Sequence, residues 1–173
     1  MTPADNQPSS TASVLQQLIY NNTEQNTNLT VCTTVGDGNC LFRAISLALT
    51  NSQDHHNFFR EKITDHMLDE AVRHNMESMF SDSETYSKHV QQMKQNGTWG
   101  TEQEIIAAAH LFNCSIICLA KDNDFYLQQF SPHFLTNPHC NSSCSHTIVD
   151  ITNTTGAHFD HATVTLREDS DSV

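Results

Sequence analysis

A cysteine at the junction between a glycine-containing loop and an apolar segment constrains the fold of this chain more than any other feature. The segment 36–44 reads GDGNCLFRA, and Gly36 and Gly38 allow backbone conformations that are closed to residues with a Cβ atom. The apolar residues that follow, as far as residue 49, have helical spacing. Cys40 is therefore expected at or next to a helix N-terminus, where unpaired N–H groups and the helix dipole favour an anion. Thiols in such positions ionise readily, so Cys40 is a candidate nucleophile.

A nucleophilic cysteine needs a base, which is usually a histidine that is distant in the sequence and adjacent in the fold. His158 lies just before a strand-like run at 162–166, and Asp160 follows two residues later. Side chains at positions i and i+2 of an extended segment point to the same face. Asp160 is thus placed to hold the imidazole of His158 in one tautomer, as the third member of a catalytic triad does. His161 is the nearest competing histidine, but no carboxylate stands two residues after it.

Three segments of the chain resemble, in order, the signature blocks of the ovarian-tumour (OTU) domain cysteine proteases. They are residues 37–44 (DGNCLFRA), 99–109 (WGTEQEIIAAA) and 158–160 (HFD). The resemblance covers roughly residues 31–166. It implies an α+β, papain-like fold with a small, mostly antiparallel sheet flanked by helices. It also implies a thiol protease of the ubiquitin conjugation pathway, a deubiquitinase that hydrolyses the peptide or isopeptide bond after the C-terminal glycine of ubiquitin.

The resemblance also implies roles for particular residues. Cys40 is the nucleophile and His158 the general base, while both Asp37 and Asp160 are candidates for the third catalytic residue. The i, i+2 geometry favours Asp160 as the residue that orients the imidazole, and Asp37 then shapes the loop before the cysteine. Backbone N–H groups in this loop form the expected oxyanion hole. The candidate donors are those of Asp37, Gly38, Asn39 and Cys40.

Two alternative functions use the same domain outline. One is an OTU-like module that binds ubiquitin without cleaving it, although an intact set of Cys40, His158 and Asp160 argues against loss of activity. The other is an OTU protease that acts on a different ubiquitin-like modifier or on a polyprotein. Labelling by electrophilic probes of several modifiers separates these alternatives from a deubiquitinase.

The charge of the chain limits its partners. The 173 residues include 8 Lys and Arg against 20 Asp and Glu, a net charge of −12 with histidines neutral. Nucleic-acid binding needs clustered cations, which the sequence lacks, whereas an acidic surface suits a basic protein partner such as ubiquitin or polyubiquitin. The sequence has no membrane-spanning apolar run, and we expect no secretory signal because its first residues lack a basic region followed by an apolar one. We therefore expect a monomeric intracellular protein, cytoplasmic or alternatively nuclear, that binds neither nucleic acid nor membranes.

Six cysteines raise the question of disulfides or zinc. Without a secretory signal, we expect reduced thiols. Six residues have spacings within the loose range of structural zinc ligands: Cys114, Cys118, His139, Cys140, Cys144 and His146. However, Cys114 and Cys118 are better explained as small apolar residues of a buried strand. We therefore expect no metal and no cofactor.

The pattern of the chain predicts one catalytic domain at residues 13–167, with a disordered tail at 1–12 and an acidic tail at 168–173. Expected helices lie at 14–20, 40–50 and 57–74, from a cap at 81–83 to about 96, and from a capping box at Thr101 to about 113. Expected strands lie at 30–35, 115–120, 125–130, 145–152 and 161–166. Trp99 is expected to pack a loop onto the following helix, with contact to ubiquitin as the alternative.

Overall fold

The structure, a computed structural model, describes residues 27–121, 125–136, 148–153 and 158–166. Within them lie five strands and five helices, in the order β1 (Thr27–Cys32), α2 (Cys40–Thr50), α3 (His56–Met67), α4 (Glu70–Glu77), α5 (Ser83–Met93), α6 (Glu102–Leu111), β2 (Ser115–Lys121), β3 (Phe125–Phe130), β4 (Ile148–Asn153) and β5 (Asp160–Leu166). The expected tails, the helix at 14–20 and four of the residues with zinc-like spacing, at 139–146, lie outside the described residues.

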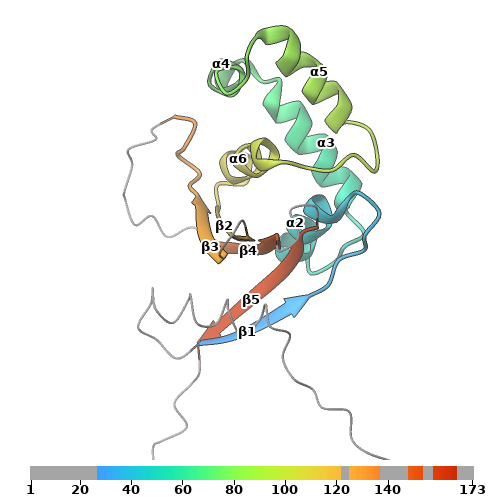
Figure 1. Cartoon of the computed structure of the whole chain (residues 1–173), viewed down its shortest axis with the longest axis vertical. Helices are drawn as coiled ribbons and strands as arrows, with labels where there is room; N and C mark the ends of the chain where they lie inside the picture. The colour runs from blue at the N-terminus through green and yellow to red at the C-terminus, as the bar shows by residue number, and fades with distance from the viewer. Residues whose placement is uncertain (1–26, 122–124, 137–147, 154–157, 167–173) are drawn as a thin grey trace, which may run out of the picture.

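The described strands form one five-stranded sheet in the order β1-β5-β4-β2-β3 (Figure 1). The pairs β1–β5, β4–β5 and β2–β3 are antiparallel, and β2–β4 is parallel. The expected α+β class with a small, mostly antiparallel sheet is confirmed. In the β1–β5 pair, Cys32 at the end of β1 is opposite His161 near the start of β5. This pairing brings the chain that leads to Cys40 beside the segment that carries His158.

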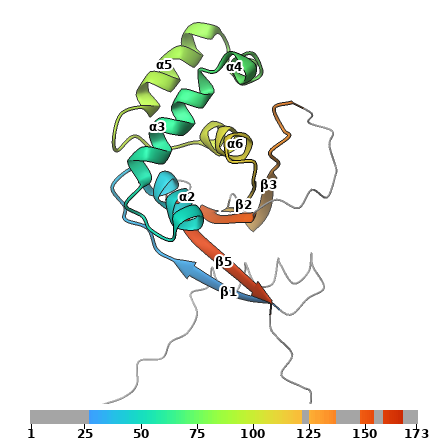
Figure 2. The ribbon, with the colours of Figure 1, turned by 180° about the vertical axis from the view of Figure 1, so that it is seen from behind.

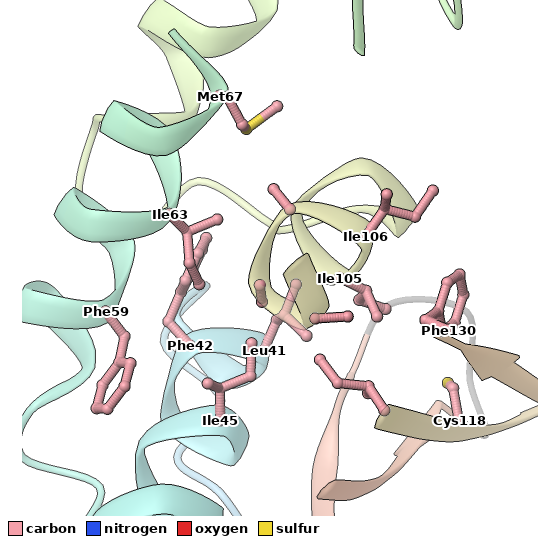
Figure 3. Close-up of a cluster of buried hydrophobic side chains, with 14 of the residues drawn as sticks. Leu41, Phe42, Ile45, Phe59, Ile63, Met67, Ile105, Ile106, Cys118 and Phe130 are labelled. Atoms are coloured by element: carbon pink, nitrogen blue, oxygen red, sulfur yellow. The ribbon is translucent and has the colours of Figure 1, made fainter. Parts of the chain in front are cut away.

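The helices gather on one side of the sheet. Helices α3, α4 and α5 lie together, and α6 runs between them and strands β2 and β3 (Figures 1 and 2). Helix α2 packs against α3 and against β4 and β5. The core lies where α2, α3 and α6 meet (Figure 3). Its labelled members include Leu41, Phe42, Ile45, Phe59, Ile63, Ile105 and Ile106.

Two predicted elements differ clearly from the structure. The predicted helix at 57–74 is two helices, because the chain leaves α3 after Met67 and begins α4 at Glu70. Asp69 has an extended backbone, and its side chain accepts a hydrogen bond from the N–H of Ala71 at 3.0 Å. An aspartate in this geometry caps a new helix rather than continuing the old one. Strand β1 ends at Cys32 instead of residue 35, since residues after it turn to contact the segment at 158–160.

Locally capped elements agree with the sequence prediction. Helix α2 has the predicted bounds. Asp82 caps α5 by accepting from the N–H of Thr85 at 2.7 Å. The predicted capping box begins α6, with the N–H of Thr101 donating to Glu104 Oε2 at 2.7 Å. Within the part of the chain that the structure describes, no helix has the length and apolar character needed to cross a bilayer.

The expectation that Trp99 is a core residue is wrong. Its side chain is 61% exposed. The neighbouring Gly100 makes the close approach to α2 instead, because a Cβ atom there would lie 2.4 Å from Cδ2 of Leu41. With backbone packed onto the helix at residue 100, the indole of Trp99 points to the surface.

Candidate active site

The loop before α2 holds Cys40 at the helix N-terminus, as the sequence predicts. Cys40 is the first residue of α2 and is 3% exposed. The loop needs glycine at position 38, where φ is +83° and a Cβ atom would lie 2.0 Å from the carbonyl oxygen of Gly97. The backbone of the 97–98 segment therefore packs directly against the loop. Only a residue without a Cβ atom allows this approach.

His158 and Asp160 form a hydrogen-bonded pair at the beginning of β5. The distance from His158 Nε2 to Asp160 Oδ1 is 3.0 Å. Because an ionised carboxylate only accepts, Nε2 carries the proton in this arrangement, and Nδ1 is left as the basic nitrogen. The backbone N–H of Thr34 donates to the same Asp160 oxygen at 2.8 Å. The hydroxyl of Thr34, a residue that is 4% exposed, donates to the carbonyl of Phe159.

The imidazole of His158 lies against the loop that leads to Cys40. A Cβ atom on Gly36 would lie 3.8 Å from Cε1 and 3.9 Å from Nδ1 of His158. The edge of the ring that bears Nδ1 therefore faces Gly36, four residues before the cysteine. The structure thus brings His158 and Asp160 together and places both beside the loop of the candidate nucleophile.

Asp37 is engaged with a different partner. Its Oδ2 lies 2.7 Å from Nη2 of Arg43, and its Oδ1 accepts from the Arg43 Nε–H at 3.1 Å. This hydrogen bond with Arg43 holds the pKa of the Asp37 carboxyl well below its usual range, and the pKa of Arg43 is raised in turn. Asp37 Oδ1 also accepts from the N–H of Asn39 at 3.1 Å. Asp37 therefore braces the loop, while Asp160 accepts the hydrogen bond from His158.

The hydrogen bond to Asp37 also bears on the expected set of oxyanion-hole donors, which stays a prediction. The Asn39 N–H already donates within the loop, so it is not available to a developing oxyanion. An aspartate side chain that accepts a hydrogen bond from the backbone N–H two residues later is a common way to close a tight turn. The candidate donors that remain are the N–H groups of Asp37, Gly38 and Cys40.

Sequence reasoning missed two buried side chains, those of Asn39 and Arg60, that support the loop before Cys40. Asn39 is 2% exposed, and its Oδ1 accepts hydrogen bonds from Arg60 Nη2 at 2.7 Å and from the N–H of Gly97 at 3.0 Å. Arg60 is also 2% exposed. Its position on the apolar stripe of α3, between Phe59 and Ile63, is the signal in the sequence that could have identified it.

Two further described thiols, those of Cys114 and Cys118, belong to the apolar core. Cys114 and Cys118 are buried in and beside β2, and burial raises the pKa of Cys114 to about 11 and that of Cys118 to about 12. Both are therefore protonated at neutral pH. Among the residues that the structure describes, no three His, Cys, Asp or Glu side chains are grouped to hold a metal ion. The other four residues of the zinc-like spacing, at 139–146, lie outside the described ranges.

Comparisons with known proteins agree on the type of domain. Residues 35–159 match the family model described as OTU-like cysteine protease. The chain is 33% identical over 100 residues to the OVARIAN TUMOR DOMAIN-containing deubiquitinating enzyme 9 of Arabidopsis thaliana, a match that covers 57% of this chain and 28% of that protein. The chain thus spans well under half the length of that relative.

Solved structures with low sequence identity share the fold. The OTUD1 OTU domain has a TM-score of 0.66 at 17% identity, over 88% of this chain and 95% of that one. An OTU domain solved in complex with ubiquitin has a TM-score of 0.58 at 19% identity, over 84% of this chain and 77% of that one.

Proposed function

This chain belongs to the OTU-like cysteine protease family, and from that premise we propose that it is a deubiquitinating enzyme. It hydrolyses the peptide or isopeptide bond after the C-terminal glycine of ubiquitin. The observation that carries the proposal is the hydrogen-bonded pair of His158 and Asp160 held against the loop that leads to Cys40. A nucleophile at a helix N-terminus and an oriented imidazole beside its loop are the two parts that acyl transfer by a cysteine requires.

In the proposed reaction, the Cys40 thiolate attacks the carbonyl carbon of the terminal glycine. The N–H groups of Asp37, Gly38 and Cys40 are the candidate donors that stabilise the resulting oxyanion. His158, as the imidazolium, protonates the leaving lysine amine, and the C–N bond breaks to give a thioester on Cys40. His158 then takes a proton from water, which attacks the thioester, releases the ubiquitin carboxylate and restores the thiolate.

Asp160 acts on His158 rather than on the substrate. Its Oδ1 accepts from Nε2 of the imidazole and from the Thr34 N–H, which together fix the carboxylate and the tautomer of the ring. Nδ1 is then the nitrogen that exchanges protons with the sulfur and the substrate. Asp37, held by Arg43, supports the shape of the loop instead.

Ubiquitin is the proposed substrate because relatives and charge point the same way. A similar protein is named a deubiquitinating enzyme, and an OTU domain of the same fold was solved in complex with ubiquitin. The net charge of −12 also favours a partner with a basic surface. Both observations support ubiquitin over an uncharged or acidic substrate.

The experiment that tests the proposal uses ubiquitin with an electrophile at its C-terminus. Wild-type protein is expected to form a stable adduct on Cys40, located by peptide mass spectrometry, and to cleave di-ubiquitin. Cys40→Ala removes the adduct. Cys32→Ala is the matched control, because Cys32 lies in β1 and is a thiol of intermediate exposure; its substitution leaves labelling intact.

Three outcomes separate the proposal from its alternatives. Labelling that persists in Cys40→Ala removes Cys40 from the role of nucleophile. Binding of di-ubiquitin of all linkages without adduct or cleavage indicates a binding module. A reaction with the probe of another ubiquitin-like modifier, and none with ubiquitin, retains the chemistry and changes the substrate.

A further inference from the structure

The strongest feature outside the proposed catalytic residues is the buried guanidinium of Arg60. It lies behind the loop of Cys40 and joins three segments of the chain. Nη1 donates to the carbonyl of Met93 at 2.7 Å, at the end of α5. Nη2 donates to the carbonyl of Thr98 at 2.8 Å and to Asn39 Oδ1 at 2.7 Å. These contacts connect α3 to the 93–98 segment and to the residue immediately before Cys40.

The guanidinium is charged, although no carboxylate accepts a hydrogen bond from it among the described contacts. Burial lowers the pKa of Arg60 to about 10, which still leaves the group protonated at neutral pH. Its acceptors are backbone carbonyls and the amide oxygen of Asn39, and its Cζ lies 4.0 Å from the centre of the Phe42 ring. Hydrogen bonds from an ionised donor are stronger than neutral ones, so these contacts hold the loop firmly.

Asn39 is the link between Arg60 and the candidate oxyanion hole. Its Oδ1 accepts from Arg60 and from the Gly97 N–H, while its own backbone N–H donates to Asp37. The side chain is fixed behind the loop and the backbone is fixed within it. The peptide units on either side of residue 39, which bear the N–H groups of Asn39 and Cys40, have little freedom to rotate.

We propose that Asn39 and Arg60 are positioning residues that hold the loop at 36–40 in the shape that its oxyanion-hole N–H groups require. The inference rests on the proposed function and extends it to residues that touch neither substrate nor reacting atoms. A misplaced donor weakens stabilisation of the oxyanion without weakening the binding of ubiquitin. The expected signature is therefore a loss in kcat with little change in KM.

The test compares Asn39→Ala with Asn39→Asp, using ubiquitin with a fluorogenic amide at its C-terminus. Asn39→Ala removes both acceptor contacts and is expected to lower kcat at least tenfold while KM stays within threefold. Asn39→Asp keeps an acceptor for Arg60 and for the Gly97 N–H, so it is expected to restore most of kcat. A general loss of stability would speed hydrogen exchange throughout the protein and not only in the loop.

A lysine substitution at Arg60, with a matched substitution at Arg73 as the control, tests the role of the guanidinium. Arg60→Lys keeps the charge, but one ammonium cannot reach all the acceptors that the guanidinium joins, so a loss in kcat of at least tenfold is expected. Arg73→Lys is the control, because Arg73 pairs with Glu77 within α4 and is not in contact with the loop. It retains wild-type kcat. Arg60→Lys also replaces Asn39→Ala as the deciding variant if the alanine protein does not fold.

Hydrogen exchange measured by mass spectrometry supplies a readout that does not depend on ubiquitin. Asn39→Ala is expected to speed exchange in peptides that cover residues 34–42 and 95–101, and Asn39→Asp to leave it close to wild type. Wild-type protein that does not turn over ubiquitin contradicts the proposed function. In that case, hydrogen exchange in the loop alone tests whether Asn39 and Arg60 hold the loop in place. The positioning role of Asn39 and Arg60 is overturned if Asn39→Ala keeps kcat within threefold or changes KM instead. It is also overturned if Asn39→Asp loses as much kcat as Asn39→Ala, or if Asn39→Ala leaves hydrogen exchange in the loop unchanged.

Discussion

His158 donates from Nε2 to Oδ1 of Asp160 at 3.0 Å, and this contact fixes which nitrogen of the ring is available for proton transfer. The sequence left Asp37 and Asp160 as rival partners for the imidazole. In the structure Asp37 binds Arg43 instead, through two oxygens and two nitrogens. The two aspartates thus have separate roles: Asp160 orients His158, and Asp37 supports the loop before Cys40.

The first prediction follows from this separation. Asp160→Asn keeps the shape of the side chain but removes the negative charge that stabilises the His158 imidazolium, so kcat should fall by about 10²–10⁴-fold. Asp37→Asn should cost only about tenfold, because the carboxylate supports the loop and does not orient the base. Steady-state kinetics with a fluorogenic ubiquitin substrate measures both losses.

Asp65→Asn is the control for the loss of an ion pair, since Asp65 Oδ1 lies 2.7 Å from Lys94 Nζ on the surface. It should leave kcat unchanged and alter the free energy of unfolding by about 1 kcal/mol or less. A larger kcat loss for Asp37→Asn than for Asp160→Asn would reverse the assignment of the two aspartates.

The second prediction concerns the two glycines before Cys40. Gly38→Ala forces a Cβ atom to within 2.0 Å of a backbone oxygen at φ +83°, so the free energy of unfolding should fall by about 2–4 kcal/mol. Gly36→Ala introduces only ordinary contacts, 3.8 Å from the His158 ring, and should change it by about 1 kcal/mol or less. Urea unfolding followed by circular dichroism measures both. Equal effects at the two positions would contradict the close packing of Gly97 on the loop.

Local signals in the sequence predicted much of this fold. The bounds of α2 and the capping box of α6 depend on residues within a few positions of each other, so a single segment contains all the information needed. The division between α3 and α4 depends on Asp69 acting as a cap, a choice that competes with the continuing apolar pattern. Sequence periodicity alone does not decide that competition.

The candidate site was predictable in its chemistry but not in its supports. Cys40, His158 and Asp160 follow from loop chemistry and i, i+2 spacing. Thr34 acts through Asp160, 126 positions away, and the Asn39 side chain acts through Arg60 and Gly97, 21 and 58 positions away. Such contacts depend on how strands and loops pack, which no local pattern specifies. The same holds for Trp99, whose exposure depends on Gly100 taking the close contact with α2.

The third prediction assigns the exposed Trp99 to substrate binding. The residue is 61% exposed and lies next to the 97–98 segment, which packs against the loop of Cys40. Trp99→Ala should leave the free energy of unfolding within about 0.5 kcal/mol of wild type and raise KM for ubiquitin substrates roughly 10-fold. Phe134→Ala, at an aromatic residue that is 41% exposed, is the control and should leave KM unchanged. An unchanged KM in Trp99→Ala would exclude this aromatic side chain from the ubiquitin contact.

The fourth prediction is that the protein loses stability in mild acid through three buried or half-buried histidines. Burial is the main cause that lowers the pKa values of His56, His66 and His110 below 6.5. His66 Nε2 lies 2.8 Å from His110 Nδ1, so this pair accommodates one shared proton but not two charges. Below about pH 6.5 the folded state binds fewer protons than the unfolded chain. The free energy of unfolding should therefore be highest above about pH 6.5 and fall as the pH drops through the pKa values of the folded state.

Urea unfolding at a series of pH values between 7.5 and 4.5 measures this fall. His66→Gln with His110→Gln removes two of these three imidazoles, so the double variant should show a shallower fall than wild type over the same range. The strongly lowered pKa of Asp37 affects stability only in more acidic solution, since its unfolded carboxyl titrates near 3.8. The two contributions are therefore separated by pH. A wild-type stability that stays flat from pH 7.5 to 4.5 would show that these imidazoles accept protons in the folded protein as readily as in the unfolded chain.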